Sequence, residues 1–525
     1  MHAVLGQPPS RIAQVTLLTE GTYPHSPGGV SVWCDQLVRA MPDVDFRVTA
    51  VTATGREQPV WELPSHVRAV ESIPMWGAVP GGKEPRGRDR RAFLGAWERL
   101  LTSLLAEGGR GGDGGRAGTD ELFGPALYDL ADWADAGTLS AGLRSEAAVR
   151  ALAGLWRRPG TDVAAALPTQ YDALTGTDLL EHALRPLAAG APTGVAHAVS
   201  GGLATLPGLL AHHRDQVPLL LTEHGVYQRE RYLGHRTGPY RWPVKSLMLH
   251  FFRLLAREAY RHSALITPGN RYNRRWEEHG GADAGRIRTV YNGVDPAAFP
   301  LAGPEPEVPT LAWAGRIDPI KDLETLIRAF ALVREEIPEA RLRIFGGTPR
   351  GGEDYRARCE ALAAALGAAG AVSFEGRVDD IRTAYAAGQV VMLSSISEGF
   401  PFTLIEAMSC GRCTVSTDVG GVREAVGETG LVVPPRDPAA MAAATLALLR
   451  DPARRAALGE AARLRVIDQF TLRQTIDAFR GIYTGLSPAE PRTGRQYGGV
   501  TWMSRVRRAD TAAGSGQRPA AEGTA

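Results

Sequence analysis

The segment SEGFPFTLIEA, residues 397–407, holds two carboxylates, Glu398 and Glu406, at either end of an apolar run. An ionised carboxylate accepts hydrogen bonds from paired O–H donors, so such a pair suits the hydroxyls of a sugar or a ribose. Other interpretations stay open from these residues alone. They are a metal site, a shared catalytic role as acid and nucleophile, and a capping glutamate beside a solvated one.

The local sequence predicts that a helix begins inside this segment. The preceding run VVMLSS, residues 390–395, is typical of a buried strand, and Pro401 suits a first helical position because its missing N–H costs nothing there. The backbone amides of Gly399, Phe400 and Phe402 would then point out of the helix N-terminus, which attracts anions and hydroxyl oxygens.

A pair of cations follows another predicted strand. In AGRIDPIKD, residues 314–322, Arg316 and Lys321 flank a turn. Lys321 is one of three lysines, with Lys83 and Lys245, in a chain whose other basic residues are arginines, so its compact ammonium is a candidate for a specific role. Two cations above one strand end can hold a pyrophosphate leaving group without a metal. The alternative is two solvated turn residues.

The first half of the chain contains two weaker motifs. In TEGTYPHSPGGVSVW, residues 19–33, Gly28 and Gly29 let the backbone approach a bound phosphate or sugar where the next helix starts. In LTEHGVYQRER, residues 221–231, His224 at a strand end can exchange a hydrogen bond with a substrate hydroxyl. A histidine satisfied by packing is an equal alternative.

Three further motifs are interpreted as non-functional. PDVDF, residues 42–46, spells the DxD of metal-dependent sugar-nucleotide enzymes but precedes a strand, so we interpret it as a solvated turn. GGTPRGGED, residues 346–354, lacks the GK[ST] of a phosphate-binding loop. Cys410 and Cys413 have CxxC spacing without a second pair to complete a zinc site, so we expect packing positions rather than a metal or redox site.

The composition is that of an ordinary globular protein, with 525 residues, 44% hydrophobic and 22% charged, and a net charge of +2. The small net charge argues against a dedicated nucleic-acid binder. The N-terminus lacks a basic stretch followed by a long apolar one, and no apolar run approaches the roughly 18 residues that span a bilayer. We therefore expect no signal peptide, no transmembrane segment and a cytoplasmic location.

Strand-like and helix-like runs alternate along most of the chain, a pattern typical of parallel, doubly wound sheets. The strands expected in the first half are residues 11–21, 46–53, 193–200, 217–225, 264–270 and 287–295, with helices at 28–41 and 244–262. The strands expected in the second half are residues 310–316, 341–347, 371–377, 390–395, 413–417 and 430–434.

The predicted fold class is α/β, with two doubly wound, Rossmann-like domains that face a cleft. The Pro-rich stretch at 300–309 separates an N-terminal domain, 1–303, from a C-terminal domain, 304–486. A helical insert at about 84–165 interrupts the first domain. Two segments without apolar periodicity are expected to be disordered, the glycine-rich loop 108–118 and the tail 487–525.

With these motifs assembled, residues 265–470 resemble the donor half of a retaining GT-B glycosyltransferase of family 4. GRIDPIKD, SEGFPFTLIEAM with its E-x7-E spacing, and YNGVD at the domain junction are marks of that family. LLTEGTYPHSPGGVSVW and LLLTEHGVYQRER in the first domain resemble its PelF-like subgroup, which uses UDP-glucose in making an exopolysaccharide.

The resemblance implies how the donor nucleotide is held. Arg316 and Lys321 would bind the diphosphate, and Gly28 and Gly29 would close over the phosphates. Glu406 would bind the ribose hydroxyls.

The same resemblance implies where the transferred sugar lies. Glu398, with the amides of Gly399 and Phe400, would face that sugar. His224 would sit near the sugar and the acceptor.

The base of the nucleotide would lie near Arg377 and Val378, after VSFEGR, mostly on backbone groups. Retention in this family is attributed to front-face displacement, in which the departing diphosphate assists removal of the acceptor proton. No metal or cofactor is then needed, since the UDP-sugar is a co-substrate.

Two alternatives share the fold. A UDP-sugar epimerase should lack the Arg/Lys plus E-x7-E set, and a catalytically silent, nucleotide-sensing subunit of a polysaccharide synthase should have lost a catalytic group. Arg316, Lys321, His224, Glu398 and Glu406 are all present. The implied partners are a nucleotide-sugar donor, a glycan acceptor and a membrane-bound polysaccharide synthase, with no nucleic acid.

Overall fold

The computed structural model describes residues 14–77, 81–105, 120–157, 167–349 and 351–487. The glycine-rich loop at 108–118 and the tail beyond Ser487 lie outside these ranges, so the expectation of disorder there stays a prediction. None of the helices within these ranges combines the length and the apolar character that crossing a bilayer requires.

The first half of the chain forms a six-stranded parallel sheet in the order β3-β2-β1-β4-β5-β6. Its strands are β1 Gln14–Glu20, β2 Asp45–Thr52, β3 Val67–Pro74, β4 Val195–Ala198, β5 Leu219–Glu223 and β6 Ser263–Pro268. The sequence predicts all of these except β3. That strand lies at the sheet edge and most of its residues are partly exposed, so it lacks an apolar run.

Helices connect these strands and fill the predicted insert. They are α1 Gly29–Arg39, α2 Gly87–Leu105, α4 Phe123–Asp135, α5 Leu139–Leu143, α6 Glu146–Trp156, α7 Gln170–Leu184, α8 Thr205–Asp215, α9 Tyr227–Thr237, α10 Trp242–His262 and α11 Arg271–His279. Short 3₁₀ turns occupy Arg185–Ala188 and Ala284–Arg286. The helices α2, α4 and α6, which lie within residues 84–165, share one hydrophobic core with α10 and the sheet, and the division of this half into a domain and an insert stays a prediction.

The second half forms another six-stranded parallel sheet, in the order β12-β11-β10-β7-β8-β9. Its strands are β7 Thr310–Ala314, β8 Arg341–Phe345, β9 Val372–Gly376, β10 Val390–Leu393, β11 Cys413–Thr417 and β12 Leu431–Val433. All six are predicted from the sequence. In both sheets the strand order reverses beside the first strand, which is where open α/β sheets bind ligands.

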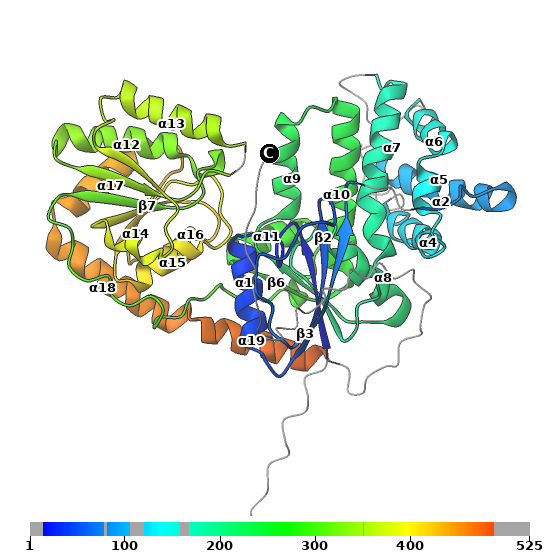
Figure 1. Cartoon of the computed structure of the whole chain (residues 1–525), viewed down its shortest axis with the longest axis horizontal. Coiled ribbons are helices and arrows are strands. Elements are labelled where there is room, and N and C mark those ends of the chain that lie inside the picture. Colours follow the sequence, from blue (N-terminus) through cyan, green and yellow to red (C-terminus); the bar gives the residue numbers. More distant parts are fainter. Residues whose placement is uncertain (1–13, 78–80, 106–119, 158–166, 350, 488–525) are drawn as a thin grey trace, which may run out of the picture. The chain divides into compact units, whose positions relative to one another are not determined.

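The helices of the second half cover both faces of its sheet. They are α12 Leu323–Glu336, α13 Glu353–Ala365, α14 Arg382–Ala386, α15 Phe402–Ser409, α16 Val422–Val426, α17 Pro438–Leu449, α18 Pro452–Gln469 and α19 Leu472–Leu486, with a 3₁₀ turn at Pro319–Lys321. Figure 1 shows α12 and α13 on one face of this sheet and α14 and α15 on the other.

The last helix, α19, returns to the first sheet. Ile476, Phe479 and Tyr483 lie in the same buried cluster as Val15 and Leu17 of β1. The chain therefore passes between the two sheets twice, once before β7 and once between α18 and α19.

The predicted strand at 287–295 is wrong. The segment forms only isolated bridges, at Ile287 and Val294, and is otherwise irregular. The N–H of Val294 donates to the carbonyl of Phe470 (2.9 Å), and the N–H of Leu472 donates to the carbonyl of Val294 (2.8 Å). The first part of the segment bonds instead to β6, since the N–H groups of Arg288 and Val290 donate to the carbonyls of Ile266 (2.9 Å) and Pro268 (3.0 Å). The segment therefore bonds to the edge of the first sheet at its start and to the returning chain at Val294.

The cysteines occupy packing positions. All four are buried, and none is in a disulfide. Burial raises the pKa of the Cys410 thiol to about 11 and that of the Cys413 thiol to about 12. Because the thiolate is the reactive form and the metal ligand, these side chains behave as small hydrophobic groups.

We expect Phe479→Ala to lower the free energy of unfolding by about 3–5 kcal/mol, because its ring is 1% exposed and its removal leaves a cavity between α19 and the first sheet. Leu464→Ala, at a side chain 60% exposed on α18, is the control and should change stability by less than about 0.5 kcal/mol. Urea unfolding followed by circular dichroism measures both. Equal stability of wild type and Phe479→Ala would contradict the packing of α19.

Candidate active site

The loop after β7 is held by the loop after β10, its neighbour in the sheet. The N–H of Ile396 donates to the carbonyl of Ile320 (2.8 Å), and Ser394 Oγ donates to the carbonyl of Lys321 (2.7 Å). These bonds fix Lys321 beside the segment that carries Glu398.

Lys321 and Glu398 form an ion pair, with 2.5 Å between Nζ and Oε1. Ser395 Oγ donates to the same oxygen at 2.5 Å. The two side chains are 21% and 10% exposed, so solvent screens this pair less than a surface pair. A lysine ammonium has three N–H groups, and two remain for another ligand. The structure thus joins the lysine of one predicted motif to the first glutamate of another.

Arg316 lies two residues after β7 and is exposed. Within the described ranges, no hydrogen bond or ion pair engages its guanidinium. Its convergence with Lys321 on one anion stays a prediction.

Two uncapped helix N-termini are neighbours. Pro401 is the N-cap of α15, with φ −74° and ψ 121°, so the expectation that it is the first helical residue is wrong by one position. Neither this cap nor Gly28, the cap of α1, makes a side-chain hydrogen bond. A Cβ on Gly29 would lie 3.7 Å from the ring of Phe402. The unsatisfied amides at both ends can therefore bind one anion.

The loop at 398–400 is clamped by contacts from the rest of the chain. A Cβ on Gly399 would lie 1.8 Å from the carbonyl oxygen of His224, so a glycine is required there. Asn292, in the motif YNGVD, donates from Nδ2 to the carbonyl of Phe400 (3.0 Å). The loop after β10 therefore lies directly against the carboxyl end of β5.

The imidazole of His224 lies edge-on against Trp33 of α1, with 4.7 Å between ring centroids. Its Nε2 is buried and has no hydrogen-bond partner among the described residues. Burial lowers the pKa of His224 to about 4, so the ring is neutral at pH 7. A buried, unpartnered nitrogen beside the 398–400 loop calls for a functional explanation.

Glu406, a turn into α15, is held by a residue that the sequence analysis misses. The hydroxyl of Tyr385, on α14, donates to Glu406 Oε2 at 2.5 Å. Burial raises the pKa of Glu406. Tyr385 itself is fully buried. No local pattern marks this tyrosine, since the contact arises only because α14 and α15 cover the same face of the sheet.

Arg377 and Val378 directly follow β9. Arg377 is exposed, whereas Val378 is half-buried and packs against the cluster that contains Tyr385. The structure therefore brings Val378 close to the Tyr385–Glu406 pair and leaves the Arg377 side chain in solvent.

The DxD aspartates are engaged away from this site. Asp43 pairs with Arg480 at 2.5 Å, and Asp45 pairs with Arg68 at 2.7 Å. Asp45 opens β2, so both carboxylates lie at the end of the strand opposite to the loops described above.

One group of side chains among the described residues has a spacing that suits a metal, namely Asp178, Glu181 and His182 on α7. Glu181 already accepts two hydrogen bonds from Arg185, of 3.0 and 2.9 Å. The group lies on a helix rather than at the strand ends, and we assign no ion to it.

Comparison with protein families matches two parts of the chain. Residues 13–285 match a model described as a domain of unknown function, DUF3492. Residues 308–451 match a model described as glycosyl transferases group 1. The second match includes Arg316, Lys321 and both glutamates.

Curated relatives are named D-inositol 3-phosphate glycosyltransferases. The one named D-inositol 3-phosphate glycosyltransferase 2, of Catenulispora acidiphila, is 37% identical over 197 residues, which are 34% of this chain and 46% of the relative. The one of Salinispora arenicola is 30% identical over 304 residues, which are 53% of this chain and 65% of the relative. The chain thus spans about half to just under two thirds of the length of these relatives.

Solved structures confirm the predicted GT-B fold. Sucrose-phosphate synthase from Thermosynechococcus elongatus aligns with a TM-score of 0.58 at 19% identity, covering 90% of this chain and 98% of its own. Anabaena HepE in complex with UDP and glucose aligns with a TM-score of 0.55 at 16% identity, covering 90% and 99%.

We expect stability to depend on pH through His224. Its pKa is about 4 in the folded protein and about 6.5 in the unfolded chain, so its contribution is complete above pH 6.5 and is lost as the pH falls toward 4. His224→Asn removes this contribution and should reduce the slope of unfolding free energy against pH by up to about 1.4 kcal/mol per pH unit.

Urea unfolding at pH 7, 6 and 5 measures this slope. His279→Asn, at an exposed position of α11, is the control and should keep the wild-type slope. Identical slopes for wild type and His224→Asn would rule out a buried, neutral ring.

Proposed function

Because this chain belongs to the DUF3492 family and carries a group 1 glycosyl transferase domain after the DUF3492 domain, we propose that it is a retaining glycosyltransferase. The transferred group is a hexose, glucose from UDP-glucose, and the acceptor is a hydroxyl of a glycan. The reaction needs no metal ion.

The ion pair of Lys321 and Glu398 is the observation that carries this proposal. It brings an ammonium with two remaining N–H groups to the same loop as the uncapped N-terminus of α15. A departing diphosphate develops negative charge, which this ammonium and the helix amides can stabilise without a metal. Arg316 is the second cation, and Gly28 and Gly29 close over the phosphates.

The carboxylates bind hydroxyls in this scheme. Glu398, held by Lys321 and Ser395, faces the transferred sugar together with the amides of Gly399 and Phe400. Its orientation is fixed because both of these partners bind Oε1, which leaves Oε2 for a sugar hydroxyl.

The nucleoside binds on the other side of α15. Tyr385 holds one oxygen of Glu406, and the other accepts from the ribose. The base lies near Arg377 and Val378 and bonds mostly to their backbone groups.

In the reaction, the acceptor oxygen attacks C1 of the sugar on the face from which the diphosphate departs. The bond from C1 to the phosphate oxygen breaks, the new glycosidic bond forms, and the departing oxygen takes the acceptor proton. His224, neutral at pH 7, positions the sugar or the acceptor through a hydrogen bond. The products are an α-linked glycoside and UDP.

The donor assignment draws support from two sides. Anabaena HepE, which shares the fold, was solved in complex with UDP-glucose. The first-domain motifs resemble the PelF-like subgroup, and we therefore propose a role in exopolysaccharide synthesis. The reaction would take place in the cytoplasm, and the partner would be a membrane-bound polysaccharide synthase.

The names of the curated relatives favour a second candidate acceptor, D-inositol 3-phosphate. In that case the reaction class and the donor site are unchanged, and only the acceptor differs. The two fold-sharing alternatives, a UDP-sugar epimerase and a silent nucleotide-sensing subunit, retain nucleotide binding but transfer no sugar.

Calorimetric titration with UDP, UDP-glucose, UDP-N-acetylglucosamine, GDP-mannose and ADP-glucose, all in EDTA, tests the proposal. We expect UDP and UDP-glucose to bind most tightly. A preference for another nucleotide would overturn the UDP-glucose assignment, and binding that requires added Mn²⁺ would overturn the metal-free mechanism. UDP release in the presence of a glycan or of inositol 3-phosphate then shows onto which acceptor the sugar is transferred, and a second UDP-hexose as the product would identify an epimerase.

Lys321→Ala should reduce kcat for UDP release from UDP-glucose on the order of 10²–10³-fold, because the leaving diphosphate loses a charge partner. Lys83→Ala, at an exposed loop position, is the matched control and should leave kcat unchanged. Circular dichroism checks that both variants fold. A folded Lys321→Ala variant with normal turnover would remove this lysine from the mechanism.

Tyr385→Phe should raise the KM for UDP-glucose about fivefold with kcat unchanged, because Glu406 loses the hydrogen bond that orients it toward the ribose. An analogue of UDP-glucose without ribose hydroxyls should bind wild type and variant equally. Tyr355→Phe removes a comparable bond, to Glu324 in the same domain, and serves as the control. If the analogue and UDP-glucose were affected alike, Tyr385 would have only a packing role.

A further inference from the structure

A pocket of about 410 Å³ opens beside α9 and the loop that precedes α10. Its volume is in the lower part of the roughly 300–1,000 Å³ range typical of small-molecule sites. It is lined by Glu230, Arg231, Gly234, His235, Gly238 and Tyr240.

The helix that lines this pocket, α9, contacts the candidate active site at its first turn. α9 begins at Tyr227, three residues after His224. Arg229, in its first turn, donates from Nη1 to Ser397 Oγ (3.0 Å), next to Glu398. A Cβ on Gly225 would lie 2.1 Å from Glu230 Oε1, so the Glu230 side chain reaches back over the end of β5.

The rise of an α-helix is about 1.5 Å per residue, so His235 lies roughly 9 Å along α9 from Arg229. That separation is on the order of one or two sugar rings. A chain of linked sugars can therefore extend from the reacting centre into the pocket.

The charges at the pocket do not suit an anion. The Arg231 guanidinium is bound to Glu20 at 2.5 Å and stacks on Tyr227, 4.5 Å from the ring centroid. Arg241, which precedes α10, is bound to Asp172. Both of these arginines are therefore already paired with carboxylates, and Glu230 adds a carboxylate to the pocket wall, so neither arginine is free to bind a phosphate.

The remaining polar groups suit hydroxyls. His235 Nδ1 is bonded to the carbonyl of Arg231 (2.8 Å), which leaves its Nε2 for a ligand. The carboxylate of Glu230 accepts hydrogen bonds, and the phenol of Tyr240 both donates and accepts them. This mixture of acceptors and donors matches a sugar ring, which presents several O–H groups in different directions.

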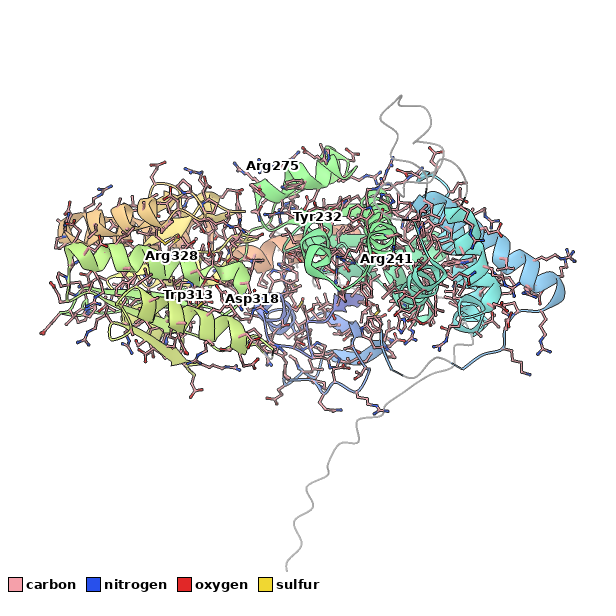
Figure 2. All side chains as sticks on the ribbon, turned by 90° about the horizontal axis from the view of Figure 1, so that it is seen from above. Tyr232, Arg241, Arg275, Trp313, Asp318 and Arg328 are labelled. Carbon is pink, nitrogen blue, oxygen red and sulfur yellow. The ribbon has the colours of Figure 1, made fainter. Side chains whose placement is uncertain are left out.

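Exposed aromatic rings lie on α9, in the loop that precedes α10 and at the start of α10. Tyr232 on α9 and Trp242 at the start of α10 are 52% and 45% exposed, and Tyr240 is 38% exposed. Tyr232 and Arg241 are both labelled in Figure 2. Aromatic side chains that combine a flat apolar face with a polar edge are suited to partly polar ligands such as sugars.

We propose that this pocket is an acceptor subsite, which binds a neutral sugar unit of the glycan next to the hydroxyl that is glycosylated. The proposal rests on the glycosyltransferase function and adds the substrate class, since the acceptor is an uncharged oligosaccharide. Glu230, His235 and Tyr240 bind its hydroxyls.

Saturation-transfer NMR on the full chain, with UDP present, tests this subsite. The probes are maltotriose, cellotriose and chitotriose, with glucose 6-phosphate against glucose as a matched pair that differs in one phosphate. We expect saturation transfer from the protein to at least one neutral trisaccharide, and stronger saturation transfer to glucose than to glucose 6-phosphate. UDP affinity is measured by calorimetry on the same samples.

Variants locate the binding. His235→Ala and Tyr240→Ala should weaken the trisaccharide about tenfold each, and Tyr240→Phe should have a smaller effect because the ring remains. Tyr171→Ala, at a tyrosine 74% exposed on α7, is the control and should bind like wild type. All four should bind UDP like wild type.

Three results would overturn the subsite. The first is the absence of saturation transfer from the protein to any of the neutral trisaccharides. The others are saturation transfer that the pocket variants leave unchanged, and pocket-dependent saturation transfer to glucose 6-phosphate alone. Loss of UDP binding in the wild type would instead overturn the proposed function, so the two failures are distinguishable.

Discussion

The geometry of the site depends on close backbone contacts that only glycine allows. A Cβ at Gly399 would lie 1.8 Å from the carbonyl oxygen of His224, and a Cβ at Gly420 would lie 1.8 Å from the carbonyl oxygen of Glu398. Any larger residue would push the loop carrying Glu398 away from the end of β5 and would separate the N-termini of α1 and α15. The functional groups therefore share a geometry that the main chain fixes, and flexible side chains need to adjust little.

The ion pair of Lys321 and Glu398 then sets the charge of this loop. Partial burial removes part of the hydration of the Lys321 ammonium, and the Glu398 carboxylate compensates for this loss by pairing with it. Because the pair is neutral overall, the ammonium alone gives little net attraction for an anion, and further attraction comes from the uncapped ends of α1 and α15 and the exposed guanidinium of Arg316. In the proposed mechanism, a diphosphate binds the remaining ammonium hydrogens while Glu398 stays oriented.

The strands were predictable because central parallel strands are buried on both faces and read as apolar runs, such as VVMLSS. β3 lies at a sheet edge and therefore lacks such an apolar run. Residues 287–295 contain apolar residues but form no strand, and Tyr291 and Val294 pack in a cluster with residues of α15, α16 and α18. Within the site, Lys321, Glu398 and His224 stand out by residue type. The contacts of Lys321 with Glu398 and of Tyr385 with Glu406 span 77 and 21 residues and depend on which elements are neighbours, which periodicity does not reveal.

The two passages of the chain between the sheets show why composition alone does not reveal which residues pack with which sheet. The Pro-rich stretch at 300–309 marks one passage between the sheets, but the return at 470–472 contains neither proline nor glycine. The two passages are hydrogen-bonded to each other through Val294, so the backbone position of one depends on that of the other. Residues of α19 thus belong by packing to the core of the first sheet although they follow the second in sequence. The carboxyl ends of β5 and β10, which build the site, are therefore linked by α19 as well as by the glycine contacts.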